Sequence, residues 1–565
     1  PIPQCEQHID QLADELETFP RHLSIHSGGF TLSADPITEI VPIEPARMEG
    51  RTIIQWDKYD LDYLGLLKVD ILALGMLSAV RKILDYTGLE FDQIPAQDKA
   101  TYKMIQKADT VGTFQVESRA QMNMSGRLMP KTFYDLVVQI AIVRPGPIVG
   151  QMVHPYLRRR RGIEAVDYPH PKLRDILGKT LGVPLFQEQL MKIAIELGQF
   201  TPGEADQLRR AIGAWRSDGS IQKVATRLFE KLTKQGISKN YALNLLEHMK
   251  GFAHYGFPES HAASFALITY VSCYLKCHHP AAFVCGLLNS QPMGFYSSHT
   301  LIDDAKGHGV NVLPVDPNQS SWESTLENGE LRMGLHLVRG LHRKEAERIL
   351  MHRPFKTIED FLAHTQLRSD LLERFAIAGG FKCFDEKERS TLWKLLAYRV
   401  IKSGTQLDLF RHYLPLSKTV FQNLSAFERV CHHYEVFGAS NEMHPMKALR
   451  TVTKLPKTTI YEAKRTPTKT FLKTSGLLLV RQKPPTANGV CFSAIEDEHG
   501  ILDLILFKNE YIKFKNLFLS HCFLIIGGII ERDGHSISMI VKTMAPIFKT
   551  PSSQNTLHIE PTQYF

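Results

Sequence analysis

The 565-residue chain carries 67 Lys and Arg against 59 Asp and Glu, a formal net charge of +8, and 43% of its residues are hydrophobic. This length exceeds what one hydrophobic core organises, so we expect three or four domains. No uninterrupted apolar run is long enough to span a bilayer, which predicts neither a membrane span nor a membrane partner. The first residues, Pro1 to Gln4, lack an initiator Met and the order of a signal peptide, which suggests a fragment of a longer protein.

The eight cysteines are scattered without paired spacing, which favours reduced thiols and a cytoplasmic location. The one close pair, Cys273 and Cys277, lies in an apolar helical stretch, and we interpret it as buried helical cysteines rather than a zinc site. Basic residues gather in the run Arg158 to Arg161 and in the stretch 447–473. Such patches are typical of a polyanion partner, although a solvated linker explains the second stretch equally well.

Residues 1–75 mix short apolar alternation with turns and end in Leu66 to Leu72, a largely apolar run that predicts a buried strand. Just before it, Asp60 and Asp62 are expected in an exposed turn. From Met76 the apolar spacing becomes helical, and similar patterns recur to about residue 290. A mostly helical region is therefore expected over 76–325.

Short helices are expected over 326–425. There the turn Arg339-Gly340, followed by a helical pattern from Lys344 to Leu350, predicts a helix-hairpin-helix whose backbone amides point at a phosphate. A linker is expected over 426–473 and a C-terminal tail over 549–565. Between them, 474–548 shows five short strand patterns with one amphipathic segment, which suits an OB-fold β-barrel. The five strands are expected at Gly476 to Val480, Val490 to Ile495, Ile501 to Phe507, Phe523 to Ile530 and Ser536 to Val541.

Six segments carry longer motifs: Gly65 to Asp70 (GLLKVD), Thr113 to Arg119 (TFQVESR), Val143 to Pro147 (VRPGP), Phe186 to Gln189 (FQEQ), Asp206 to Ala211 (DQLRRA) and Tyr255 to Ser264 (YGFPESHAAS). These segments resemble the bacterial C-family DNA polymerases, the family of the DNA polymerase III α subunit, and the resemblance covers nearly the whole chain. Ile54 to Asp57 (IQWD) and Leu288 to Tyr296 (LNSQPMGFY) are more similar to the error-prone DnaE-like branch than to the main replicase.

The resemblance implies a multi-domain α+β protein. Its parts would be the end of the thumb with a palm remnant over 1–75, the helical fingers domain over 76–325, a helix-hairpin-helix and clamp-binding region over 326–425, and the C-terminal OB-fold. It also implies template-directed DNA synthesis from dNTPs on primed template DNA, error-prone and directed past damage. The alternatives are a non-catalytic DNA-binding accessory module and the high-fidelity replicative α subunit.

Within that family, Asp70 corresponds to the third catalytic carboxylate, a ligand in a two-metal Mg²⁺ site. The other two carboxylates come from an Asp-x-Asp motif upstream of the region with which this chain begins, so we expect the chain alone to be inactive. Lys68, on the same strand face as Asp70, is expected to meet triphosphate charge. Without the resemblance, Asp70 reads as the cap of the following turn. The resemblance further places Arg209, Arg210 and His261 at the incoming nucleotide.

The remaining predicted contacts are with DNA and with partners. Arg144, Arg339, Gly340, Arg481, Lys483 and Phe492 are predicted to contact DNA, although Phe492 fits a barrel core equally well. Gln406-Leu407-Asp408-Leu409-Phe410 looks like a short sliding-clamp-binding peptide, which we favour over a packed loop. Damage-response accessory proteins are further expected partners.

Overall fold

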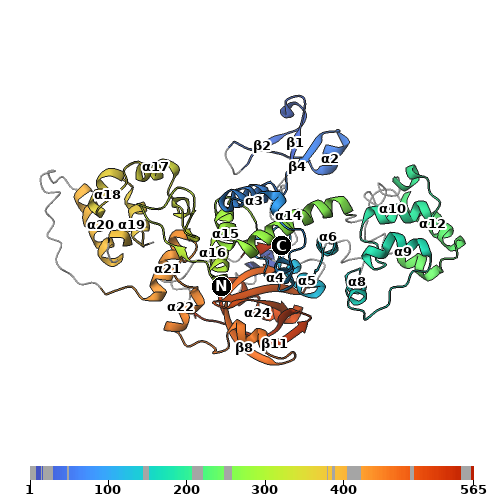
Figure 1. Cartoon of the computed structure of the whole chain (residues 1–565). Helices are drawn as coiled ribbons and strands as arrows, with labels where there is room; N and C mark the ends of the chain where they lie inside the picture. Colours follow the sequence, from blue (N-terminus) through green and yellow to red (C-terminus); the bar gives the residue numbers. More distant parts are fainter. Residues whose placement is uncertain are drawn as a thin grey trace. The chain divides into compact units, whose positions relative to one another are not determined.

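A computed structural model describes residues 29–46, 50–143, 152–206, 220–246, 257–294, 296–377, 379–384, 388–403, 422–483 and 489–548, with a few shorter stretches near both ends (Figure 1). The chain divides into two compact units, Pro1–Leu77 and Ser78–Phe565. Across the described parts, no helix combines the length and hydropathy needed to cross a membrane. Arg144, Arg209, Arg210 and the predicted clamp peptide 406–410 lie outside the described residues.

The first unit contains two small antiparallel sheets. Strand β1 (Gly29–Leu32) pairs with β4 (Leu67–Asp70), and β2 (Ile43–Pro45) pairs with β3 (Thr52–Ile54). The prediction that β4 is buried is wrong, since Leu67 is 61% exposed and Lys68 and Asp70 are exposed as well. A two-stranded ribbon has too few neighbours to cover both faces of a strand.

The aspartates of the expected turn lie in a short helix instead. Helix α2 (Lys58–Tyr63) contains Asp60 and Asp62, and both of them are exposed as predicted. The helix forms because Asp57 and Asp60 cap its first turn reciprocally, each carboxylate accepting the backbone N–H of the other residue at 3.1–3.2 Å. Asp60 therefore has a structural role.

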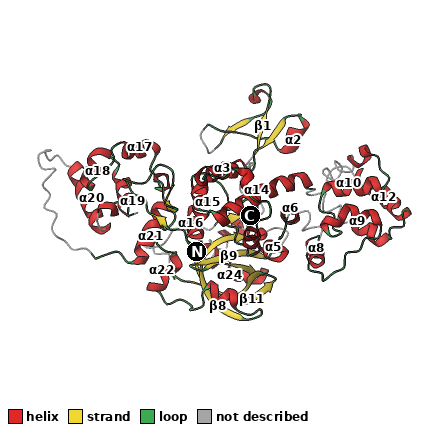
Figure 2. Cartoon of the chain, viewed as in Figure 1, coloured by secondary structure: helices red, strands yellow, loops and turns green. Residues whose placement is uncertain are grey.

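The second unit begins with the predicted helical region, and its helicity is confirmed (Figure 2). One large apolar core joins most of these helices, and α6 (Phe133–Ile142) is buried along nearly its whole length. Its cap is a reciprocal pair of Thr132 and Asp135. Cys273 is buried and Cys277 half-buried, both as free thiols. The other helices are α3 (Leu74–Thr87), α4 (Lys99–Gln106), α5 (Arg119–Leu128), α8 (Val153–Arg160), α9 (Pro171–Leu177), α10 (Gln187–Glu196), α12 (Ser220–Lys234), α14 (Glu259–His278), α15 (Pro280–Leu288) and α16 (Ser298–Gly307).

A small sheet of β5 (Val312–Leu313), β7 (Glu330–Arg332) and β6 (Thr325–Glu327) leads into the predicted hairpin region. After a 3₁₀ turn (Leu335–Leu337), the chain passes through Gly340 into α17 (Arg343–Met351), as expected of a helix-hairpin-helix. Three helices follow: α18 (Ile358–Thr365), α19 (Ser369–Ile377) and α20 (Glu388–Ser403).

Residues 426–473, predicted to be a linker, fold instead into α21 (Ala426–Phe437), α22 (Pro445–Val452) and α23 (Ile460–Arg465). The many Lys and Pro residues of this stretch are typical of a linker, but the stretch also contains the capping boxes of two helices. Ser425 with Glu428 caps α21, and Thr459 with Glu462 caps α23, by reciprocal bonds. The apolar faces of α21 and α22 pack against Leu477 of the barrel, which gives this segment a core of its own.

The C-terminal region is a closed five-stranded barrel. Its strands follow the order β11-β12-β10-β9-β8, and β11 pairs back with β8 to close the ring. All five strands lie where the alternation predicts them, and α24 (Lys508–Ser520) is the predicted amphipathic segment. A further strand, β13 (Thr562–Tyr564), runs parallel to β8. The barrel strands are β8 (Phe471–Gln482), β9 (Cys491–Asp497), β10 (Gly500–Leu506), β11 (Phe523–Asp533) and β12 (Ser536–Pro546).

Candidate functional site

Asp70 ends β4 on the surface of the first unit. Its Oδ1 accepts the backbone N–H of Leu72 at 2.8 Å, so Asp70 caps the following turn, which is the structural role weighed for it from the sequence. Lys68 lies two residues earlier and therefore on the same strand face. Among the described residues, Asp70 belongs to no group of three or more potential metal ligands. The residues described here therefore do not by themselves fit a two-metal centre.

His261 lies in the first turn of α14 and is exposed. Its ring packs between those of Phe257 and Phe265, with centroid distances of 5.0 and 4.1 Å. The start of the helix is fixed from outside, because the Glu259 N–H donates to the Glu188 carboxylate at 3.0 Å. The sequence motif thus builds a rigid helix start that presents one imidazole at the surface. Its role at a nucleotide stays a prediction.

Hydrogen bonds with neighbouring helices hold the hairpin turn in place. The N–H of Arg339 donates to the Val436 carbonyl at 3.0 Å, and the carbonyl of Arg339 accepts from Arg374. Gly340 has a φ of +82°, a left-handed conformation that favours glycine, whereas the nearest atom to a side chain there, Nη1 of Arg374, is the end of a flexible side chain that can shift. The N–H of His342 donates to Glu345 at 2.9 Å. Two backbone N–H groups near the turn therefore already donate within the protein, which leaves fewer N–H groups that could bind a phosphate.

Arg481, which the sequence predicts to contact DNA, is not exposed. Its side chain is buried, with 8% of the residue exposed, and its guanidinium donates to the carbonyls of Phe518, Leu519 and His521 at 2.9, 3.2 and 3.4 Å. These carbonyls end α24, which has no intrahelical donors left for them. Arg481 is therefore the C-terminal cap of that helix. Lys483 and Phe492 are exposed, Phe492 to 39%, so the barrel-core alternative for Phe492 does not hold.

The four consecutive arginines also serve the fold. Arg158 and Arg159 pair with Glu164, Arg160 with Asp135 at 2.7 Å, and Arg161 with Asp533 at 2.7 Å. These ion pairs give the run a structural role at the end of α8, and its binding of a polyanion stays a prediction. Sequence spacing could not reveal these pairs, because Asp135 and Asp533 lie far from the run.

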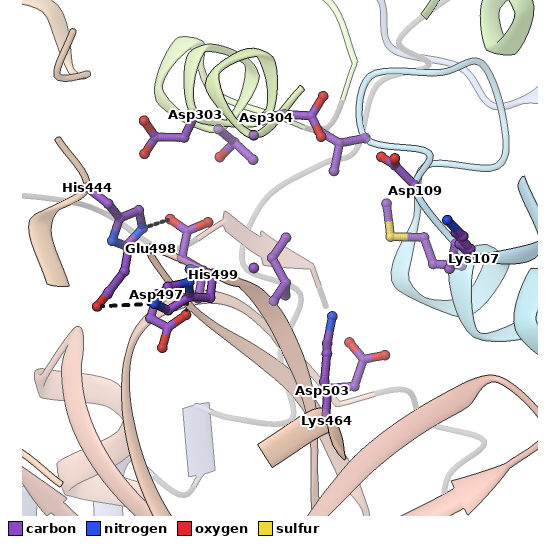
Figure 3. A pocket seen from close by; sticks show the side chains of 18 of the residues that line it. Lys107, Asp109, Asp303, Asp304, His444, Lys464, Asp497, Glu498, His499 and Asp503 are labelled. Carbon is purple, nitrogen blue, oxygen red and sulfur yellow. Dashed lines mark hydrogen bonds and ion pairs between the residues drawn. The ribbon is translucent and has the colours of Figure 1, made fainter. Parts of the chain in front are cut away.

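Sequence reasoning missed a charged cavity of about 780 Å³ within the second unit (Figure 3). Its walls come from α4–α5, α16, the start of α22, α23 and the barrel strands β9, β10 and β12. Eight acidic side chains line it against five Lys and Arg side chains. Its charged residues are Asp109, Asp303, Asp304, Glu442, Glu496, Asp497, Glu498, Asp503, Lys107, Arg119, Lys306, Lys447 and Lys464.

One side of the cavity is neutralised from within the protein. Nζ of Lys276, with 1% of its side chain exposed, lies 3.1 Å from Asp109 and 2.9 Å from Asp304. His308 adds a second cation, with Nε2 2.8 Å from Asp109. The hydrogen bond to Asp109 is the main cause that raises the pKa of His308 to about 9.

Three family models match the chain. The bacterial DNA polymerase III alpha subunit finger domain matches residues 74–236, and the bacterial DNA polymerase III alpha NTPase domain matches residues 3–73. The helix-hairpin-helix motif matches residues 309–392, which contain the turn at Gly340. Together with the helical region and the hairpin, these matches show that the chain belongs to the bacterial C-family DNA polymerases, the family of the DNA polymerase III α subunit.

Within this family, the chain is similar to proteins named error-prone DNA polymerase. It is 45% identical to that of Anaeromyxobacter dehalogenans over 573 residues, which cover 96% of this chain and 50% of the relative. It is 45% identical to that of Alkalilimnicola ehrlichii (93% of this chain, 52% of the relative) and 43% identical to that of Pseudomonas aeruginosa (95% and 54%). The chain thus spans about half the length of the curated relatives it matches, and it belongs to the error-prone, DnaE-like branch.

Proposed function

We propose that this chain takes part in error-prone, template-directed DNA synthesis, in which a nucleotide is transferred from a dNTP to a primer 3′-hydroxyl opposite damaged template. The observation that carries this proposal is the identity of about 45% to error-prone DNA polymerases over nearly the whole chain. The chain would contribute the helical fingers, the helix-hairpin-helix region and the barrel, and it would act in the cytoplasm.

In this proposal β4 is a palm remnant and Asp70 is the third catalytic carboxylate. A two-metal nucleotidyl transfer needs several carboxylates around two Mg²⁺ ions, and one aspartate cannot hold both. The resemblance supplies the other two carboxylates from an Asp-x-Asp motif upstream. Lys68, Arg209, Arg210 and His261 would meet the incoming nucleotide. The bound Mg²⁺ ions would supply charge stabilisation for the triphosphate.

The barrel is proposed to be an OB-fold that carries single-stranded template. Five strands closed by β11 and β8 agree with that fold. Two exposed side chains at neighbouring strand ends support a nucleic-acid contact. Phe492 offers an aromatic face for a base, and Nζ of Lys483, 4.9 Å from the Tyr511 ring centre, offers a nearby cation.

Two experiments test the proposal with the purified chain. Without the upstream carboxylates we expect no primer extension in the presence of Mg²⁺, so extension that Asp70→Ala abolishes would contradict the incomplete site. Fluorescence anisotropy should show binding to primed and single-stranded DNA, because the binding surfaces lie in this chain. Phe492→Ala should weaken single-strand binding about 5- to 100-fold, the loss of one stacked base. Phe471→Ala, an exposed phenylalanine at the far end of β8, is the matched control.

The peptide 406–410 is proposed to bind the sliding clamp, with Leu409 and Phe410 in an apolar groove. Replacing both with alanine should reduce clamp capture and leave the affinity for primed DNA unchanged. If the double variant captures clamp as well as the unchanged chain, the peptide has no such role. Damage-response accessory proteins are proposed as further partners, and the Arg144 and Arg339 side chains as further DNA contacts.

A further inference from the structure

Three side chains to which the proposed function assigns no role meet at the edge of the charged cavity. His299 and Asp303 are four residues apart on α16 and so share one helix face, and His444 precedes α22. Nδ1 of His299 lies 3.2 Å from Oδ2 of Asp303. One ligand atom from each of the three lies within 4.8 Å of the other two. Figure 3 shows Asp303 and His444 at the same end of the cavity, Asp303 above His444.

Two of these three ligand atoms are buried and make no hydrogen bond among the described residues: Oδ2 of Asp303 and Nε2 of His444. The 3.2 Å approach of Oδ2 is to Nδ1 of His299, which is itself the third ligand atom. The shortest ion-pair distance of this Nε2 is 3.5 Å, to Glu496, and only 8% of His444 is exposed. A buried polar atom without a partner is unfavourable, and in native proteins it commonly marks a place for an ion or a water.

The side chains behind the cluster suit a metal centre as well. Nε2 of His299 lies 2.8 Å from Oε1 of Glu496, a barrel carboxylate with 4% of the residue exposed. A histidine that binds a metal through one ring nitrogen commonly donates its other N–H to a carboxylate in this way. Nζ of Lys306 holds the second oxygen of Asp303 at 3.1 Å, which leaves Oδ2 toward the cluster.

The neighbouring group of Asp109, Asp304 and His308 has similar residue types, but its two carboxylates are already neutralised by a lysine. The ammonium of Lys276 lies within 3.1 Å of both carboxylates and occupies the position that a metal ion would take. In the described structure no lysine lies between His299 and His444 in this way. Lys306 contacts the other oxygen of Asp303, Oδ1, which does not face the cluster. The two groups therefore provide a test and an internal control.

We propose that Nδ1 of His299, Oδ2 of Asp303 and Nε2 of His444 bind one divalent transition-metal ion. The hydroxyl of Tyr434, which contacts both ring nitrogens of His299, gives up its contact with Nδ1 when the ion enters and keeps the one with Nε2. Two imidazoles and one carboxylate favour Zn²⁺, Co²⁺ or Fe²⁺ over Mg²⁺, which prefers an all-oxygen shell. The ion joins α16 to the start of α22 and, through Glu496, to the barrel.

Metal binding has a consequence for α22. At present Nδ1 of His444 accepts the N–H of Met446 at 3.1 Å, which caps the helix. Binding through Nε2 places the ring proton on Nδ1, so the capping bond is given up when the ion enters. Hydrogen exchange at the Met446 amide should therefore speed up in the metal-loaded chain.

The test uses tag-free chain stripped of metal with a chelator, titrated with Co²⁺ and Zn²⁺. Calorimetry should give one equivalent, and bound Co²⁺ should give visible d–d bands. His444→Asn removes a ligand and leaves a residue that can cap α22, and Asp303→Asn keeps the shape without the charge. Each should weaken binding at least about 100-fold, and Glu496→Gln about 10- to 100-fold.

His308→Gln, in the group that Lys276 occupies, is the matched control and should leave metal affinity unchanged. Circular dichroism of every variant separates lost binding from lost folding, and Asp303→Asn and His444→Asn test the site independently. The proposal is overturned if the unchanged chain binds neither ion, or if folded His444→Asn or Asp303→Asn binds with unchanged affinity. Equal loss in His308→Gln would place the ion in the other group and also overturn it.

Discussion

Nη1 of Arg161 and Oδ1 of Asp533 lie 2.7 Å apart, although 372 residues separate them in the chain. The other oxygen of Asp533 lies 2.7 Å from Nε of Arg127 on α5, so one carboxylate at a barrel turn holds two arginines of the helical region. Backbone contacts accompany these pairs, since the N–H of His535 donates to the Gly126 carbonyl at 3.2 Å. The turn between β11 and β12 is thus fastened to α5, and the barrel should follow movements of that helix.

Replacing Asp533 with alanine should loosen this junction. The carboxylate is 45% exposed, which limits the effect, and we expect a loss of about 1 kcal/mol in the local stability of the turn, seen as faster hydrogen exchange at His535 and Ser536. Its partners lower the pKa of Asp533 against the effect of burial, so the stabilisation is present above pH 4 and is lost as the pH falls through the lowered value. Glu531→Ala, an exposed acid on the same strand, is the control and should leave the exchange unchanged.

Replacing Gly126 with alanine tests the same junction sterically. A Cβ there would lie 3.0 Å from the Ser536 nitrogen and 3.2 Å from the His535 carbonyl carbon, which are backbone atoms that cannot rotate away. In an open helix position this change stabilises by about 1 kcal/mol. Here we expect net destabilisation, measured by thermal unfolding. Gly307→Ala at the end of α16, where nothing lies within 4 Å, should be neutral or stabilising. Equal effects of the two changes would show that the turn does not press on α5.

The sequence predicted the local elements well where periodicity and caps agree. The five barrel strands and the helical region follow from alternation and spacing, because each pattern buries one face of one element. The hairpin followed from a single glycine in a short apolar turn. The prediction of a linker over 426–473 is wrong, because Lys and Pro dominate its composition although two capping boxes and the apolar faces at Val430 and Leu449 specify helices.

The candidate sites were less predictable, because their partners come from distant segments. In the sequence Arg481 resembles an exposed basic residue, and only the structure shows that it binds the carbonyls at the end of α24. The cavity combines residues of several helices and three barrel strands, so no local motif marks it. The four-residue spacing of His299 and Asp303 was the one local signal available. Asp70 was found from the motif Gly65 to Asp70, and its catalytic role stays a prediction.

The group of His308 and Asp109 should make stability depend on pH. The pKa of His308 in the folded chain is about 9, against 6.5 for the free side chain, with Asp109, Asp304 and Lys276 around it. Because the folded value is raised, the stabilisation is fully present below pH 6.5 and is lost as the pH rises toward 9. We expect a loss on the order of 2 kcal/mol over this interval, measured by urea unfolding at fixed pH values.

His308→Gln should remove most of this dependence. His364→Gln is a suitable comparison, because His364 also lies four residues after an aspartate on a helix but is 52% exposed. An exposed pair of this kind contributes little, so the comparison variant should keep the wild-type pH profile. A flat profile in the unchanged chain between pH 6.5 and 9 would show that His308 is not held in its charged form.

Arg481 and Phe492 lie on paired strands of the barrel and should respond to substitution in opposite ways. Arg481→Ala leaves three carbonyls at the end of α24 without their donor and removes a buried guanidinium, so we expect the barrel to lose about 2–4 kcal/mol in hydrogen-exchange protection. Phe492→Ala removes an exposed ring and should change protection by less than about 0.5 kcal/mol while weakening single-strand binding. Arg481→Lys should lower the protection at the end of α24 about as much as Arg481→Ala does, because one ammonium cannot reproduce the forked contacts to three carbonyls. If Arg481→Ala instead lowered DNA affinity with barrel protection intact, Arg481 would contact DNA after all, and its bonds to α24 would have to open for that contact.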